Sequence, residues 1–364
     1  MSNLHKERLL SLDLFRGITM LFLLAEGTPL FYLLNAAAPE NIIFRQFLHA
    51  EWHGMRFWDL IQPYFTFIIG VAMVFSVKKR VSGGASWSNT FMHMLFRCAV
   101  LFFLGIMLQS IYEEKLVWDL HNILTLLSIN ILITFLVFQF PWRTQLVFSF
   151  GLLIITEIIY QYVSIDSFDQ PLVKHHNFGT YIDMLLMGRT HPDGWVVFNS
   201  IPATAHMIWG VLTGRILIDK CSTSKKINIL ALASLGGLLA GYGMDWLAII
   251  PINKKICTSS FMLASGGWCL GSFVLLYWIA DIKGYKKWVP FFTIVGMNPI
   301  FVYLFSKTVG RSFLNKFVPE FTKSVMGAVG FPEWVMKISA YMLILAMEWY
   351  LCYWLYKRKI FIKL

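Results

Sequence analysis

Charged residues are scarce in this sequence. Asp, Glu, Lys and Arg make up 14% of the 364 residues, whereas hydrophobic residues make up 57% and the mean hydropathy is +0.62. A soluble domain carries about 25% charged residues, so this composition excludes a soluble fold. The ~10-residue alternating segments of a membrane barrel are absent, and apolar runs approach the ~20 residues of a bilayer crossing. We therefore predict an all-α integral membrane protein.

Cysteine is also sparse, and its spacing carries no motif. The five cysteines contain no CxxC pair: Cys98, Cys221, Cys257, Cys269 and Cys352. All but Cys221 lie in or beside apolar segments, where a cysteine behaves as a small hydrophobe. The sequence therefore predicts neither a disulfide framework nor a metal site.

Acidic residues are outnumbered by basic ones. Lys and Arg total 31 against 20 Asp and Glu, which gives a net charge of +11. Such an excess suggests nucleic acid as the partner of a soluble protein. Here the basic residues fall at the ends of apolar runs, which indicates a membrane surface instead. We expect the lipid bilayer as a partner and no nucleic acid.

About ten apolar segments are predicted to span the membrane in one bundle, as a single domain over residues 1–364. They are 16–35, 57–77, 91–110, 120–140, 144–163, 199–218, 227–249, 257–280, 289–306 and 336–356. Short basic connectors alternate with longer ones rich in His, Pro and aromatic residues. The short basic side is predicted to be cytoplasmic, together with both termini. The apolar stretch 18–34 is longer than a signal-peptide core, so we expect a retained first helix.

The segment "FLHAEWHGMRFWDLIQPYF" contains several ionisable residues where a helix is predicted to enter the membrane. A histidine such as His49 can accept and return a proton at neutral pH, and Asp59 is placed to orient a neighbouring imidazole. Two interfacial histidines in an aromatic belt are an equally simple interpretation. Glu51 and Arg56 are predicted to be exposed loop residues. Ionisable groups at a membrane edge are costly and commonly line a site or a pathway, so both interpretations stay open.

Other polar groups accompany apolar segments elsewhere. In "SLDLFRGIT", Asp13 and Arg16 share a helix face and form either an interfacial ion pair or a phosphate contact. The stretches 198–210, 251–260 and 294–304 place Pro, Asn, Ser or Thr in or beside helices. Such groups either satisfy a broken helix or line a cavity, and Asn298 before Pro299 is the clearest case.

The remaining histidines are given simpler roles. His121 and His206 are interpreted as lone helical packing residues. The loop 164–198 contains further histidines but no carboxylate or cysteine at a zinc-site spacing, so we predict an ordered lid over the outer mouth rather than a metal site.

Six of these stretches, in the same order, resemble the heparan-α-glucosaminide N-acetyltransferase family and its bacterial NagX-type relatives. They are "SLDLFRGIT", "HAEWHGMRFWDLIQPYFTFIIG", "YIDMLLMG", "PDGW…IPATAHMIWG", "PINKKICTSS" and "DIKGYKKWVPFFTIVGMNPIFVYL". The resemblance implies a transmembrane acyltransferase. It would move the acetyl group of cytoplasmic acetyl-CoA to the amine of glucosamine or a glucosaminide on the outer side. The histidine regarded as catalytic in the family is His49 here.

Two departures from the family bear on the acceptor. Family members commonly carry Asn near the end of the first helix, where "LLAEGTP" places Glu26. A "GVLQRI"-like segment is replaced by "HNILTLLSI", which lacks the Gln and Arg. The resemblance implies a bacterial inner-membrane, multi-pass enzyme.

The predicted site combines these residues. His49 is the general base or the nucleophile, and Asp59 orients it. The donor contacts are expected at Arg16, Asp13 and Asn298, and the acceptor contacts at Trp52, His53, Glu26, Asn253 and Ser260. Asn298, Ser260 and Asn253 are also candidate donors to the oxyanion. Acetyl-CoA is the co-substrate, and no metal is expected.

Two other functions remain open from the sequence. A transporter for a sugar or a muropeptide fragment also uses broken helices and a polar cleft. A glycan O-acyltransferase keeps the donor and changes the acceptor. The length of the acceptor glycan, a homodimer and the kinetic order are likewise left open.

Overall fold

The described chain, residues 9–362 of a computed structural model, is helical and contains no strand. Its internal contacts divide it into two compact units. We call residues 9–45 and 272–362 the first unit, and residues 46–271 the second unit. The predicted all-α class is confirmed. We predicted one functional domain over residues 1–364. Two compact units can together form one functional domain, so this stays a prediction.

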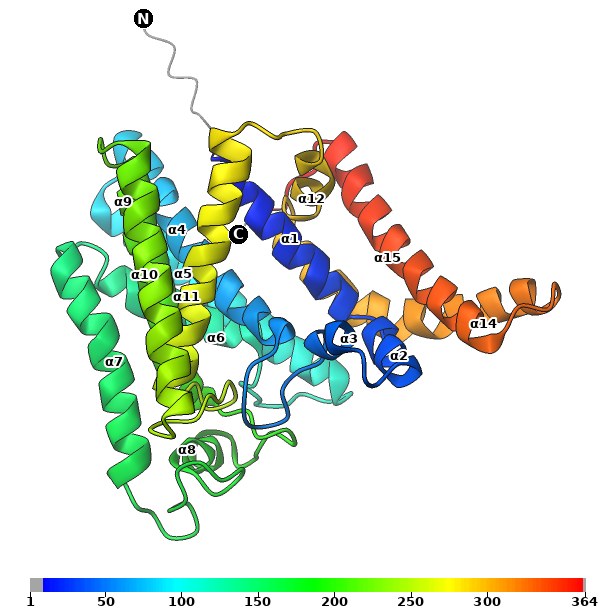
Figure 1. The fold of residues 1–364 in the computed structure, drawn as a ribbon, viewed down its shortest axis with the longest axis horizontal. Coiled ribbons are helices and arrows are strands. Elements are labelled where there is room, and N and C mark those ends of the chain that lie inside the picture. The colour runs from blue at the N-terminus through cyan, green and yellow to red at the C-terminus, as the bar shows by residue number, and fades with distance from the viewer. Residues whose placement is uncertain (1–8, 363–364) are drawn as a thin grey trace, which may run out of the picture. The chain divides into compact units, whose positions relative to one another are not determined.

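The second unit contains most of the long helices (Figure 1). Its elements are the 3-10 turn η1 (Phe57–Leu60), α4 (Ile61–Ser82), α5 (Trp87–Tyr112), α6 (Ile123–Leu136), α7 (Trp142–Tyr162), α8 (Phe178–Met187), the 3-10 turn η2 (Val197–Asn199), α9 (Ser200–Ile218), α10 (Thr223–Trp246) and α11 (Ser259–Tyr277) up to residue 271. Ser and Asn side chains start four of these helices by accepting a backbone N–H of the first turn. The four are Ser86, Asn122, Asn177 and Ser222.

The first unit is built from shorter pieces. They are α1 (Leu10–Glu26), α2 (Leu30–Ala37), α3 (Ile42–Gln46), the end of α11, the π-helical turn η3 (Trp278–Ile282), α12 (Val289–Val295), α13 (Pro299–Phe305), the π-helical segment η4 (Ser306–Leu314), α14 (Asn315–Gly327) and α15 (Glu333–Lys357). In Figure 1, α14 lies beside the amino-terminal part of α15.

Seven helical stretches in the described residues are long and apolar enough to cross a membrane. They are η1 with α4, α5, α7, η2 with α9, α10, α11 with η3, and α15. Counting each of two bent pairs as one span raises the number to nine. The predicted segment 120–140 contains α6, which has 14 residues. Each of the ten predicted segments thus contains a helix, while ten crossings and cytoplasmic termini stay predictions.

Two helix breaks in the first unit occur where the sequence carries Gly and Pro. α1 and α2 meet at 70° around Gly27 and Pro29, and α12 and α13 are separated just before Pro299. Proline has no N–H to continue the helical ladder. Asn315 Nδ2 donates to the carbonyl of Gly27 (2.8 Å) and so satisfies one acceptor that the first break leaves. Of the two interpretations given for Asn298–Pro299, the structure shows the helix break, and the cavity lining stays a prediction.

Glycine allows α4 and α9 to approach closely within the second unit. A Cβ atom at Gly70 would overlap the carbonyl oxygen of Met207, and one at Gly210 would overlap that of Phe67. Small residues at such a crossing let two helix backbones touch, as is common inside membranes. This contact holds α9 against α4, whose preceding turn carries Asp59.

Replacing Gly210 by valine is expected to prevent this packing, because the clash is with backbone and no side-chain rotation relieves it. We expect a loss of stability of about 3 kcal/mol or more. Gly236→Val is the matched control, since nothing lies within 4 Å of its Cβ position on α10. The yield and melting temperature of detergent-solubilised protein measure the difference. Equal behaviour of the two variants would contradict this account of the α4–α9 contact.

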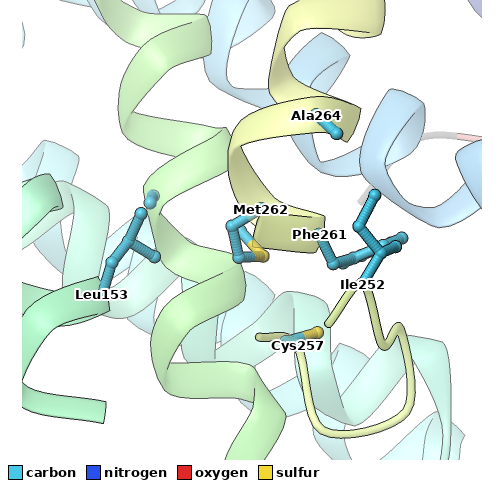
Figure 2. Packing of buried hydrophobic residues seen from close by; sticks show 7 residues of the cluster. Leu153, Ile252, Cys257, Phe261, Met262 and Ala264 are labelled. Carbon is cyan, nitrogen blue, oxygen red and sulfur yellow. The ribbon is translucent and has the colours of Figure 1, made fainter. Parts of the chain in front are cut away.

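A buried apolar cluster fixes the loop between α10 and α11. Figure 2 shows Leu153 of α7 and three residues of α11 beside Ile252 and Cys257 of this loop. Ile252 and Cys257 are 1% and 2% exposed. The loop is therefore seated in the core although it has no regular structure. Burial raises the pKa of the Cys257 thiol to about 12, so this cysteine is an inert packing group.

Candidate active site

The segment between residues 47 and 60 bends sharply before the helix that follows. η1 begins at Phe57, and Asp59 lies in its first turn. Asp59 Oδ2 accepts the backbone N–H of Arg56 (2.9 Å) and that of Ala50 (3.2 Å). A carboxylate is well suited to this position because the amino end of a helix presents unpaired N–H groups. The carboxylate thus shapes the segment that carries His49.

His49 and Asp59 form the predicted pair. His49 Nδ1 lies 2.8 Å from Asp59 Oδ1. The side chain of Asp59 is 1% exposed, whereas that of His49 is 33% exposed. The carboxylate oxygen accepts a hydrogen bond from Nδ1–H, so the neutral ring carries its lone pair on Nε2. The geometry is that of an orienting acid behind a histidine that can act on a substrate.

Lys254 completes this cluster from the loop between α10 and α11. Its Nζ lies 3.5 Å from Asp59 Oδ1 and 3.4 Å from His49 Nδ1, and its side chain is 7% exposed. Lys254 was not predicted as a site residue, although it lies in the stretch "PINKKICTSS". A lysine beside prolines and polar residues in a loop ordinarily indicates a solvated surface, and only the fold shows otherwise.

Arg56 lies in a different environment from the one predicted. It was predicted to be an exposed loop residue, but it is partly buried and its Nη1 donates to the backbone carbonyl of His49 (2.9 Å). Glu51 is exposed, as predicted. Arg56 therefore fixes the backbone of His49 while Asp59 fixes its ring.

The loop 164–198 reaches over this cluster with two tryptophan contacts. Trp195 meets the His49 ring edge to face at 6.4 Å, and Lys254 Nζ lies 5.0 Å from the centre of the Trp195 ring. Trp52 donates from Nε1 to the carbonyl of Leu172 (2.7 Å). The segment is ordered and includes α8. Its action as a lid stays a prediction.

His53, the other histidine of the opening segment, lies apart from His49. Its side chain is 63% exposed, and its Nε2 lies 2.7 Å from Asp245 Oδ1. The predicted acceptor contacts Trp52 and His53 thus both lie in the segment that precedes η1. Their contact with a substrate stays a prediction.

Asn253 and Ser260 support the loop that carries Lys254. Asn253 Oδ1 accepts the backbone N–H groups of Lys255 and Ile256. Ser260 Oγ donates to the carbonyl of Pro251. Both side chains are buried and hold backbone groups, and their predicted contacts with the acceptor or with an oxyanion stay untested.

Four predicted residues belong to the first unit. Arg16 Nη2 donates to Asp13 Oδ1 (2.8 Å), which confirms the expected pair on one face of α1. Glu26 Oε1 lies 4.0 Å from Lys307 Nζ.

Asn298 Nδ2 donates to the carbonyl of Ile360, and its Oδ1 accepts the N–H of Ile362. The structure therefore gives Asn298 a role in anchoring the end of the chain, and its predicted donor role stays untested.

His121 was predicted to be a lone packing residue in a helix, and this is wrong. It precedes α6 and is held between two carboxylates, with Nδ1 3.0 Å from Asp119 Oδ1 and Nε2 2.9 Å from Asp183 Oδ2. Arg189 contacts Asp119 (3.5 Å), and the ring of His191 lies 5.4 Å from that of His121.

His206, by contrast, is a buried helical residue as predicted, with Nε2 3.0 Å from Ser265 Oγ.

The His121 cluster joins three segments of the second unit. Asp119 and His121 precede α6, Asp183 lies on α8, and Asp183 Oδ1 accepts the N–H of Val197 (2.9 Å). Burial would lower the pKa of His121, but the hydrogen bonds with Asp119 and Asp183 raise it to about 9. Burial and repulsion by His121 lower the pKa of His191 to about 4. A charged imidazole thus lies beside a neutral one at neutral pH.

The raised pKa of His121 predicts a loss of stability at alkaline pH. The contribution is complete below the unfolded value near 6.5 and is lost as the pH rises through about 9. We expect faster hydrogen exchange in residues 113–122 and 188–197 above that pH. His121→Ala should remove this dependence, whereas the exposed control His176→Ala should keep it. An unchanged alkaline profile in His121→Ala would contradict this assignment.

Residues 9–362 contain no cluster of side chains that could bind a metal ion. No group of three or more His, Cys, Asp or Glu side chains gathers there as a metal site would require. The prediction that no metal takes part is not tested by this observation.

Comparisons with known proteins agree with the resemblance seen in the sequence. A model of the family described as "Heparan-alpha-glucosaminide N-acetyltransferase, catalytic" matches residues 8–254. The heparan-alpha-glucosaminide N-acetyltransferase of Mus musculus is 24% identical over 86% of this chain, and that of Homo sapiens is 23% identical over 86%. The matched region is 54% of each relative, so the chain spans about half of their length. The family match covers both His49 and Lys254.

Proposed function

Because the chain belongs to the heparan-α-glucosaminide N-acetyltransferase family, we propose that it is a transmembrane N-acetyltransferase acting on an amino sugar. It takes the acetyl group from cytoplasmic acetyl-CoA and passes it to the amine of glucosamine or a glucosaminide on the outer side. The observation that carries this proposal is the 2.8 Å contact between His49 Nδ1 and the buried Asp59 carboxylate.

The proposed step is a direct transfer with His49 as general base. The amine nitrogen attacks the thioester carbonyl, and His49 Nε2 takes the proton that the nitrogen loses. The carbon–sulfur bond then breaks, and the thiolate of CoA receives a proton from the imidazolium. The products are the N-acetyl sugar and CoA thiol. Asp59 holds the ring during both transfers and stabilises its charged form.

The residues that bind acetyl-CoA are proposed from the charges of the protein and of CoA. CoA carries several phosphate charges, and the short connectors predicted to be cytoplasmic are basic, so they attract it. Arg16 is a suitable phosphate ligand because a guanidinium presents paired donors, and Asp13 holds that guanidinium in place. Asn298, Asn253 and Ser260 remain the candidate oxyanion donors. We place the enzyme in a bacterial inner membrane as a multi-pass protein.

The activity is tested with purified protein, acetyl-labelled acetyl-CoA and glucosamine. We expect CoA release that depends on the amino sugar, and a product whose mass and fragmentation show an amide. An ester product would replace this proposal with O-acyl transfer. Uptake of the sugar into liposomes without acetyl-CoA, and no CoA release, would replace it with transport.

The order of the steps has its own test. Wild-type protein is incubated with labelled acetyl-CoA alone, quenched and digested. Direct transfer predicts that no peptide carries the label. A labelled His49 peptide whose acetyl group then moves to glucosamine would instead make His49 a nucleophile in a ping-pong reaction.

A further inference from the structure

Asp183 is a buried carboxylate that lies outside the His49 cluster. It is 0% exposed, and its two oxygens have different partners. Oδ2 lies 2.9 Å from His121 Nε2, and Oδ1 accepts the backbone N–H of Val197 (2.9 Å). The carboxylate therefore links an imidazole to the backbone of the loop 164–198. A buried charge is costly once it loses its partners, so these bonds oppose a displacement of Val197.

The imidazole of His121 is anchored on its other side as well. Its Nδ1 lies 3.0 Å from Asp119 Oδ1, and Arg189 Nε lies 3.5 Å from Asp119 Oδ2. Arg189 also donates from Nη2 to Glu113 Oε1 (2.8 Å). The ring faces a carboxylate at each nitrogen, so its orientation is fixed. Asp183 is thereby tied, through His121, to the residues at the end of α5 and before α6.

A short extended segment carries this constraint to Trp195. Val197 is two residues from Trp195, and the backbone of Val196 between them is extended (φ −126°, ψ 142°). Val196 is 2% exposed and packs in an apolar cluster with Tyr160 and Ile256. Successive side chains of an extended segment point to opposite sides. The packing of Val196 and the hydrogen bond of Val197 together fix the direction in which Trp195 points.

Trp195 is the residue with which this segment reaches the candidate active site. The centre of its ring lies 6.4 Å from that of His49, edge to face, and 5.0 Å from Lys254 Nζ. An indole is a large, rigid group with few side-chain torsions, so its place depends mainly on the backbone that carries it. A displacement of Val197 would therefore move the surface against which the ring of His49 packs.

We infer that Asp183 and His121 are a positioning pair for the candidate active site. By holding the N–H of Val197, they keep Trp195 against the ring of His49. The effect on the rate rests on the acetyl transfer proposed above, whereas the contact itself does not. Without this support the imidazole would spend less time with Nε2 directed at the amine, and a misplacement of about 1 Å in an active site costs up to about 10²-fold in rate.

The first test is a double-mutant cycle between Asp183→Ala and Trp195→Ala in purified protein. For each single variant we expect kcat to fall about tenfold, while KM for acetyl-CoA stays within about threefold of wild type. Because both changes remove the same support, the double variant should be no slower than the slower single variant. Asp169→Ala is the control and should keep the wild-type rate, because Asp169 is exposed in the same loop.

Three further variants separate the hydrogen bond from the side chains. Val197→Pro removes the N–H that Asp183 accepts, at the start of η2, where proline suits the backbone and an extended residue precedes it. We expect the same fall in kcat as for Asp183→Ala, and Val197→Pro takes its place in the cycle if Asp183→Ala does not fold. Val197→Ala keeps the N–H and should stay near the wild-type rate. Asp183→Asn keeps an oxygen for this N–H and presents an amide N–H to a neutral His121, so it should retain most of the rate.

The second readout does not depend on turnover. Diethyl pyrocarbonate modifies exposed imidazoles, so its reaction with His49 at one fixed pH, followed by peptide mass spectrometry, reports how far this ring is covered. We expect faster modification in Trp195→Ala, Asp183→Ala and Val197→Pro than in wild type, and no change in Val197→Ala. If the wild-type protein transfers no acetyl group to an amino sugar, the proposed function fails, and this readout still tests the position of Trp195.

Two results would overturn the inference. One is a double variant whose loss of rate is the product of the two single losses, because Asp183 would then act independently of Trp195. The other is a folded Val197→Pro protein with the wild-type rate and wild-type modification of His49. Either result would limit the pair to the stability of the loop.

Discussion

His49→Ala is expected to lower the turnover of acetyl transfer by about 10²- to 10⁴-fold, the usual contribution of a positioned general base. The substitution removes Nε2, the atom that accepts the amine proton, and leaves the Asp59 carboxylate with Lys254 as its remaining side-chain partner. The rate is measured with labelled acetyl-CoA and glucosamine in purified protein. KM for acetyl-CoA should change far less than kcat, since the ring acts in the step that transfers the acetyl group.

The control for this prediction is His176→Ala, which removes an exposed histidine of the loop 164–198. Its rate should match that of wild type. The melting temperature of each variant shows that a lost rate is not lost folding. A folded His49→Ala protein that keeps more than about a tenth of the wild-type rate would be incompatible with His49 as the base.

Asp59→Asn is expected to have two large effects. An amide does not match the donors that surround this position, so the imidazole loses its orienting acceptor, and turnover should fall about 10²- to 10⁴-fold. The change also leaves the ammonium of Lys254 buried without its carboxylate. Removing one partner of a buried ion pair costs about 3–5 kcal/mol, so the melting temperature should fall as well.

Asp169→Asn is the matched control, because Asp169 is exposed in the loop 164–198. It should affect neither rate nor stability. The double variant Asp59→Asn with Lys254→Met should recover part of the lost stability, since the unpaired charge is removed, but it should not recover turnover. A single Asp59→Asn variant with wild-type rate and stability would contradict the proposed role of this carboxylate.

The parts of the site that were predictable from sequence are those that local spacing controls. His49 and Asp59 are ten residues apart in one segment that enters a helix, so both were expected at the same mouth. Asp13 and Arg16 are three apart on α1 and pair as helix geometry requires. The break before Pro299 follows from the chemistry of proline.

The parts that were missed depend on contacts between distant segments. Lys254 lies 205 residues from His49 in the sequence, so its contact with the His49–Asp59 pair depends on the tertiary fold. His121 and Asp183 are 62 residues apart, and neither shows a local pattern that predicts the other. Arg56 was assigned to solvent because a lone arginine in a loop is ordinarily exposed, and its bond to the carbonyl of His49 depends on the bend before η1.

The account depends on the reacting carbon meeting the imidazole of His49. The most direct measurement is an experimental structure of the protein with an unreactive acetyl-CoA analogue. We predict that the carbon replacing the thioester carbonyl lies about 3–4 Å from Nε2 of His49, with Nδ1 still directed at Asp59. An analogue bound with that carbon far from this ring would contradict the account.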